Sequence, residues 1–273
     1  MERARIGQRD LEYEVVGTGE PAVFIHGSFI ADTFRPLLGE PALADRYQLI
    51  RYRRRGYGDS VAGTGPGSVD EQAADCGELL RHIGSEHAHV VGHSYGGCVA
   101  LQFALNEPGL VRSLVLLEPA LAVGDSAGDY RQALAQGIQR YRQVGAAAVL
   151  PDMLQARWPG YEDTLEQVLP GAFEQAVADG DASFETDLAG LLEWRFDETD
   201  ARQLAQPALV VIGEASDSLW PRFGDTHRRL LAWLPRAEGF TLPGATHFMQ
   251  LESPSRSRSL AEALAGFFGR HEF

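Results

Sequence analysis

Residues 90–97 read VVGHSYGG and place Ser94 between Gly92 and Gly96 in the pattern G-x-S-x-G. A short apolar run ends just before this stretch, and the helix-forming run CVALQFAL follows it at residues 98–105. A serine on a tight strand-to-helix turn is presented to a substrate, and small flanking residues permit the strained backbone. The following helix directs N–H groups toward developing negative charge. The stretch predicts a nucleophilic Ser94; the alternative is a tight turn with a solvated serine.

The sequence on both sides of this turn alternates short β-branched runs with helical runs. We expect strands at residues 10–16, 22–25, 47–52, 89–91 and 114–117, and again at LVVIG from residue 209 and near residue 240. Helices are expected at residues 34–43, 69–83, 94–105, near 230 and at 255–268. This alternation predicts an α/β fold, with a mostly parallel sheet covered by helices on both faces.

The alternation stops between residues 122 and 206, where the pattern predicts helices at 130–142 and 161–168 and no strand. Gly124, Pro151 and Gly180 are read as breakers between these helices. We therefore expect two parts. Residues 1–120 and 207–273 would form the α/β core, and residues 121–206 a helical cap subdomain.

Two further stretches carry candidate catalytic groups. The first, FIHGSF at residues 24–29, follows a strand, and its glycine lets a backbone N–H of Ser28 or Phe29 face the site. With the N–H of Tyr95 it would form an oxyanion hole; His26 is read as part of the turn. The second is LPGATHFMQLE, in which His247 follows a strand and is the candidate general base.

Taken together, four motifs resemble those of the α/β-hydrolase family: HG at Gly27, RRGYGDS at 54–60, GHSYGG, and GATH near the C-terminus. The resemblance implies an eight-stranded, mostly parallel sheet with a helical cap after strand six. It also implies Ser94 as nucleophile, His247 as base, and an oxyanion hole of Tyr95 and the residue after Gly27. One departure is Arg53, which stands where many members have an aspartate.

The acid of the triad has two candidates. In the resemblance, the usual position follows strand seven, but Ser216 occupies it here and Asp217 comes one residue later. The other position used in the family is the end of strand six, where Glu118 closes LVLLE. A carboxylate after four apolar residues needs a buried partner, and a histidine N–H would provide one. We favour Glu118, with Asp217 as the alternative acid or a helix N-cap.

The composition excludes several functions. All 24 cationic residues are arginines, so the chain has no lysine for a Schiff base or a nucleotide-binding P-loop. A net charge of -14 argues against nucleic acid as a partner. Two cysteines, a charged N-terminus and the lack of a long apolar run favour a cytoplasmic protein without a membrane segment. We expect a small-molecule substrate and neither cofactor nor metal, and we leave open a homodimer.

The residues predict acyl transfer, with an acyl-enzyme on Ser94. Residues 121–206 contain 15 acidic residues and 6 arginines, a field that would repel anions. We therefore expect a neutral, fairly hydrophobic ester or lactone, bound by aromatic residues including Trp158, Trp194 and Trp220. The alternatives are a C–C bond hydrolase of the meta-cleavage type, a cofactor-free lyase or cyclase, and a non-catalytic ligand receptor on the same fold.

Overall fold

The computed structural model describes residues 1–6, 9–61 and 67–272. Its centre is an eight-stranded sheet with the strand order β1-β2-β4-β3-β5-β6-β7-β8. The pairings of β2 with β1 and with β4 are antiparallel, and the others are parallel. The strands are β1 (Glu2–Ile6), β2 (Arg9–Val16), β3 (Glu20–Ile25), β4 (Tyr47–Tyr52), β5 (Ala88–His93), β6 (Val111–Leu117), β7 (Ala208–Gly213) and β8 (Ala237–Leu242).

Helices cover both faces of this sheet, which explains why its middle strands are almost continuously apolar. Every residue of β5 and β7 is buried. One face packs against α1 (Arg35–Leu38), α2 (Pro41–Ala44) and α13 (Pro254–Gly269). The other face packs against α3 (Val69–Ile83), α4 (Tyr95–Asn106) and α12 (Pro221–Trp233). The short segments η1 (Pro108–Leu110) and α11 (Ser216–Leu219) complete this part of the chain.

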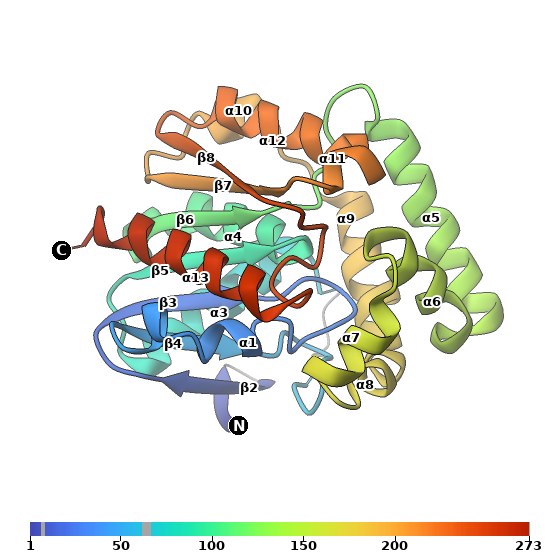
Figure 1. Cartoon of the computed structure of the whole chain (residues 1–273), viewed down its shortest axis with the longest axis horizontal. Coiled ribbons are helices and arrows are strands. Elements are labelled where there is room, and N and C mark those ends of the chain that lie inside the picture. The colour runs from blue at the N-terminus through green and yellow to red at the C-terminus, as the bar shows by residue number, and fades with distance from the viewer. Residues whose placement is uncertain (7–8, 62–66, 273) are drawn as a thin grey trace.

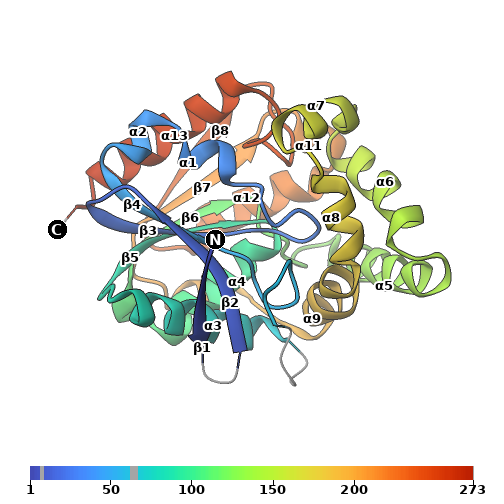
Figure 2. The ribbon, with the colours of Figure 1, turned by 90° about the horizontal axis from the view of Figure 1, so that it is seen from below.

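The chain between β6 and β7 is helical, and all of its helices except the last lie beyond the carboxyl ends of the parallel strands, on the right in Figure 1 and again on the right in Figure 2. We call residues 121–206 the inserted helical segment. Because parallel strands all end at one edge, the residues after β3, β5, β6 and β8 meet beneath it. Its elements are α5 (Ala127–Val144), α6 (Ala146–Arg157), α7 (Tyr161–Val168), α8 (Ala172–Ala178), the π-helical η2 (Ala182–Leu188), α9 (Ala189–Glu193) and α10 (Glu198–Ala201).

The α/β class and the mostly parallel, eight-stranded sheet are confirmed. The bounds predicted for residues 69–83 and 161–168 agree with α3 and α7. The sequence reading missed β1, and it was wrong to treat Pro151 as a breaker, because α6 runs through it. Buried Val149, Leu150 and Leu154 anchor α6, so packing outweighs the hydrogen bond that the proline removes. None of the helices in the described residues has both the length and the apolarity needed to cross a membrane.

Candidate active site

Ser94 occupies the single position between the end of β5 and the start of α4. Its backbone has φ 53° and ψ -117°, a conformation that costs energy in a residue with a side chain. The two glycines of the motif allow this turn by close packing. A Cβ on Gly96 would lie 2.0 Å from the Ile25 carbonyl oxygen, and one on Gly92 would lie 2.4 Å from the Gly96 carbonyl oxygen. Both glycines of the G-x-S-x-G pattern are therefore needed, because a side chain at either position would collide with backbone atoms.

Backbone strain gathers around this serine. In the part of the chain that the structure describes, the non-glycine residues with positive φ are Phe29, Ser94 and Glu118, with φ of 77°, 53° and 43°. They follow β3, β5 and β6, so all three lie where the parallel strands end, at the carboxyl-terminal side of the sheet. Such strain persists only where the surrounding structure enforces it, and it is typical of functional sites.

His247 and Glu118 form a buried pair at this edge. The His247 Nδ1 lies 2.7 Å from Glu118 Oε2, and both side chains are at most 3% exposed. The other Glu118 oxygen, Oε1, accepts a hydrogen bond of 2.8 Å from the Gly213 N–H. The imidazole is also stacked on Phe223, with ring centroids 4.5 Å apart. The carboxylate thus fixes the orientation of the imidazole and leaves Nε2 as its other ring nitrogen.

Asp217, the alternative acid, lies elsewhere. Its side chain is 49% exposed and lies 3.8 Å from Arg228 Nη1. The structure therefore brings Glu118, and not Asp217, to His247. Within the described residues no hydrogen bond joins Ser94 Oγ to the His247 ring. Such catalytic hydrogen bonds are often long or poorly aligned before substrate binds.

The pKa values at this pair are shifted in opposite directions. Burial raises the pKa of Glu118, and the Gly213 N–H partly offsets this because it stabilises the carboxylate. Burial lowers the pKa of His247 well below its usual value, and the positive charges of Arg157 and Arg222 lower it further. His247 is therefore neutral at physiological pH, as a general base must be.

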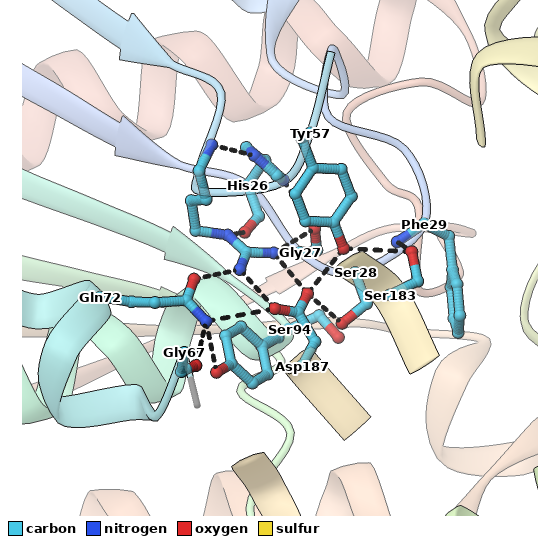
Figure 3. Close-up of polar contacts among 12 residues, drawn as sticks. His26, Gly27, Ser28, Phe29, Tyr57, Gly67, Gln72, Ser94, Ser183 and Asp187 are labelled. Carbon is cyan, nitrogen blue, oxygen red and sulfur yellow. Dashed lines mark hydrogen bonds and ion pairs between the residues drawn. The ribbon is translucent and has the colours of Figure 1, made fainter. Parts of the chain in front are cut away.

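The loop after β3 lies directly against Ser94, as Figure 3 shows. A Cβ on Gly27 would lie 3.0 Å from Ser94 Cβ, so a side chain at this position would push against Ser94. The Phe29 N–H donates a 3.2 Å hydrogen bond to Ser183 Oγ in the inserted helical segment. The Ser28 Oγ donates to Asp187 Oδ2 at 2.9 Å. Of the two predicted loop donors, the N–H of Phe29 is therefore already engaged, which favours Ser28 beside Tyr95.

A buried ion pair that the sequence did not suggest holds this loop. Arg54 Nη1 and Nη2 donate to the two Asp187 oxygens at 2.7 and 2.6 Å, and each side chain is 1% exposed. Tyr57 OH also donates to Asp187 Oδ2, at 2.7 Å (Figure 3). The remaining Arg54 N–H groups reach Gln72 and the His26 and Gly27 carbonyls. The π-helical η2 thus ties the inserted helical segment to the loop beside Ser94.

His26 belongs to this structural group, as predicted from its turn. Its Nε2 accepts a 3.0 Å hydrogen bond from the Arg54 N–H, and its carbonyl accepts one from Arg54 Nε. The sequence contained one indication of this buried group of polar residues, the run RRR at residues 53–55 directly after an apolar strand. Nothing in the sequence indicated that Asp187, 133 residues away, would be its partner.

The three tryptophans predicted to bind substrate lie in different places. The ring of Trp158 stacks on Phe248, next to His247, with centroids 5.6 Å apart. Trp220 lines a cavity of about 300 Å³ between α5 and α6. Trp194 instead donates its Nε1–H to Gln102 Oε1 on α4 at 2.8 Å. Among the described residues no group of three His, Cys, Asp or Glu side chains is arranged to hold a metal ion.

Comparison with known proteins places this geometry in a family. A family model described as alpha/beta hydrolase fold matches residues 21–254. The chain is 30% identical to the dihydrolipoyllysine-residue acetyltransferase component of the acetoin cleaving system of Pseudomonas putida, over 99% of this chain and 70% of that protein. It is 27% identical to the 2-(acetamidomethylene)succinate hydrolase of Mesorhizobium japonicum, over 92% of this chain and 90% of that protein.

A solved structure agrees at the level of the fold. The enol-lactonase from Burkholderia xenovorans LB400 matches with a TM-score of 0.83 and 18% sequence identity, over 98% of this chain and 100% of that one. At this identity the match concerns the path of the backbone and carries no statement about the substrate.

Proposed function

Because the chain belongs to the α/β-hydrolase fold family, we propose that it is a serine hydrolase that cleaves a carboxylic ester or a lactone through an acyl-enzyme on Ser94. The observation that carries this proposal is the buried Glu118–His247 pair, 2.7 Å apart, at the sheet edge where Ser94 stands on a strained turn. A base oriented by a carboxylate at the site of a serine nucleophile is the arrangement used for acyl transfer.

In the proposed first step, Ser94 Oγ attacks the carbonyl carbon and His247 Nε2 takes the hydroxyl proton. Glu118 accepts the Nδ1–H and stabilises the imidazolium without being protonated itself. The N–H groups of Tyr95 and Ser28 would receive the oxyanion, each such donor contributing about 2.7–4 kcal/mol in comparable sites. His247 then returns the proton to the leaving alkoxide, and the acyl group stays on Ser94.

In the second step, water attacks the acyl-enzyme carbonyl. His247 removes a proton from this water, the tetrahedral intermediate collapses, and Ser94 Oγ leaves with the proton that His247 returns. For a lactone the alkoxide and the acid are parts of one product, so the same two steps open the ring. The acid is released and the enzyme returns to its initial state.

A fluorophosphonate probe tests the nucleophile. We expect one covalent label per chain by intact mass, and none in the Ser94→Ala variant. Labelling that persists in Ser94→Ala, or no labelling of the folded wild type, would contradict the proposal. The second result would leave the lyase, cyclase and receptor alternatives, and a screen of C–C cleavage substrates would test the meta-cleavage alternative.

Two variants test the acid. Glu118→Gln keeps the shape of the side chain but not its charge, so we expect kcat to fall by about 10³–10⁴. Asp217→Asn is the matched control and should change kcat by less than about threefold, since Asp217 lies at the surface beside Arg228. The reverse ranking in an ester-hydrolysis assay would identify Asp217 as the acid.

A further inference from the structure

Two arginines approach His247 from different elements. Arg157 ends α6 in the inserted helical segment, and Arg222 lies in the first turn of α12. The charges of both are felt at His247, where they lower its pKa in addition to the effect of burial. Arg222 also lies beside Phe223, the residue stacked on the His247 ring, with its guanidinium carbon 4.1 Å from the Phe223 ring centroid.

The half-buried side chain of Arg222 lacks a full set of hydrogen-bond partners. Its Nε and Nη1 atoms are inaccessible to solvent and form no hydrogen bond among the described residues. The charge of Arg222 acts on the Glu118 carboxylate. Both oxygens of that carboxylate already have partners, one in His247 and the other in the Gly213 N–H. The guanidinium instead stacks on Tyr130, 3.8 Å from the ring centroid. The fold thus holds this side chain in place and leaves its donors unused.

Arg157 is held in a similar way. Its Nη1 donates to the Met153 carbonyl at 2.8 Å, within its own helix. Its guanidinium lies 5.0 Å from the ring centroid of Trp220, which is itself fixed by a 2.8 Å hydrogen bond from Nε1 to the Ala156 carbonyl. Burial lowers the pKa of Arg157, and the nearby charge of Arg222 lowers it further. The structure shows no ion pair between Arg157 and any described carboxylate.

Of these two arginines, Arg157 lines a cavity between α5 and α6. The cavity of about 300 Å³ is lined by Arg157, Tyr130 and Trp220 together with apolar side chains of α5 and α6. Tyr130 and Trp220 are also the aromatic residues against which Arg222 lies. An acidic residue, Asp152, lines the cavity as well, but its carboxylate is paired with Arg140 at 2.7 Å.

This arrangement is unfavourable for the protein on its own. The charge of Arg222 acts on Arg157, Arg222 lies at the positive end of the α12 helix dipole, and two of its guanidinium nitrogen atoms are buried without acceptors. Both arginines also oppose the formation of the His247 imidazolium that acyl transfer requires. A bound anion would satisfy the donors, balance the charges and favour the imidazolium at the same moment.

We propose that Arg222 and Arg157 bind a carboxylate of the substrate, so that the enzyme acts on esters or lactones that carry a free carboxylate near the scissile bond. This inference rests on the proposed serine hydrolase function, whose substrate class it names. It replaces the expectation of a neutral substrate, which was based on the net charge of residues 121–206. Exposed carboxylates such as Asp125, Glu162 and Asp197 are screened by salt over about 8 Å, whereas the two arginines act at the site.

Paired chromogenic esters test the proposal. The anionic probes are the mono-4-nitrophenyl esters of succinate, glutarate and adipate, and the neutral controls are their methyl esters, which share the leaving group. We expect the wild type to favour at least one anionic ester over its neutral control by about 10-fold or more in kcat/KM. Arg222→Gln should reduce this preference, measured as the ratio of kcat/KM for the two esters of a pair, by about 10- to 100-fold, because a charge-assisted pair is lost.

Arg228→Gln is the matched control, since Arg228 lies on the same helix and its side chain is 64% exposed. This variant should keep the wild-type preference. A wild type that prefers the neutral member of all three pairs, or an Arg222→Gln variant with unchanged preference, overturns the carboxylate site while leaving the hydrolase intact.

A binding measurement separates failure of this inference from failure of the proposed function. Monomethyl glutarate is titrated calorimetrically into Ser94→Ala and into the Ser94→Ala/Arg222→Gln double variant, neither of which can turn over an ester by the proposed route. Affinity at least about 10-fold weaker in the double variant supports the carboxylate site even if no ester is hydrolysed. Equal affinity, or no binding to either, overturns it.

Discussion

Arg54 and Arg222, two arginines near the proposed active site, differ in how their guanidinium groups are paired. Arg54 uses its guanidinium fully, with Asp187, Gln72 and two backbone carbonyls as acceptors. Arg222 stacks on Tyr130 but leaves two buried nitrogen atoms without acceptors. Because desolvated charges are costly unless they are paired, the first arrangement is the one expected of a structural element. The second is the one expected where an external partner completes the site.

The Arg54–Asp187 pair and the arginines Arg222 and Arg157 also differ in which part of the site they contact. Arg54 and Asp187 hold the loop that contains Ser28 and so connect the inserted helical segment to the proposed oxyanion hole (Figure 3). They bind nothing outside the chain in our proposal and act by positioning. Arg222 and Arg157 instead influence His247 through their charge.

The largest expected effect is on the Arg54 side of the comparison. Asp187→Ala would leave the Arg54 guanidinium buried and unpaired, and we expect the free energy of unfolding to fall by about 3–5 kcal/mol. Chemical denaturation measures this. The Arg54→Met/Asp187→Leu double variant removes both charges and should recover much of the loss. A loss below about 1 kcal/mol for Asp187→Ala would mean that the pair is not the anchor described above.

The next effect concerns the acid limb of the pH profile. His247 must be neutral to act as a base, and its pKa is lowered, so kcat/KM should persist below pH 6.5 and fall only as the pH drops through the lowered value. The charged or titratable groups that face His247 are Glu118, His93, Arg157 and Arg222. His93 stays neutral over this range because burial lowers its pKa to about 3.

Arg222→Gln removes one cation, which favours the imidazolium and raises the pKa of His247. The acid limb for a neutral ester should therefore move to higher pH, whereas Arg228→Gln should leave it in place. A shift to lower pH, or the same shift in both variants, would show that Arg222 does not act on His247.

The smallest expected effect is the change in the free energy of unfolding when Arg222 is replaced. Arg222→Gln relieves a half-buried, incompletely paired charge, so the free energy of unfolding should be unchanged or should rise by up to about 1 kcal/mol. Thermal and urea unfolding without ligand measure this. A loss of more than about 2 kcal/mol would place Arg222 in the same structural class as Arg54 and would remove the contrast between them.

Much of the fold followed from local pattern. The capping box at Ser68 and Glu71 and the left-handed Gly84 bound α3 at the predicted residues. Strand β1 was missed because ERARI is short, charged and paired only with β2 at the sheet edge. Continuous apolar strands such as β7 were easier to find, because burial on both faces leaves no polar positions.

The sequence by itself predicted the α/β architecture, the tight turn at Ser94, which we propose as the nucleophile, and the candidate base His247. These depend on consecutive residues, because glycine sterics and hydrophobic period are local properties. Only the tertiary structure brought Glu118 to His247 and paired Arg54 with Asp187. It also placed the charges of Arg157 and Arg222 near the imidazole and left two buried nitrogen atoms of Arg222 without acceptors. Those contacts join residues that are between 25 and 133 positions apart. They depend on the strand order and on how the inserted helices pack, which no local pattern encodes.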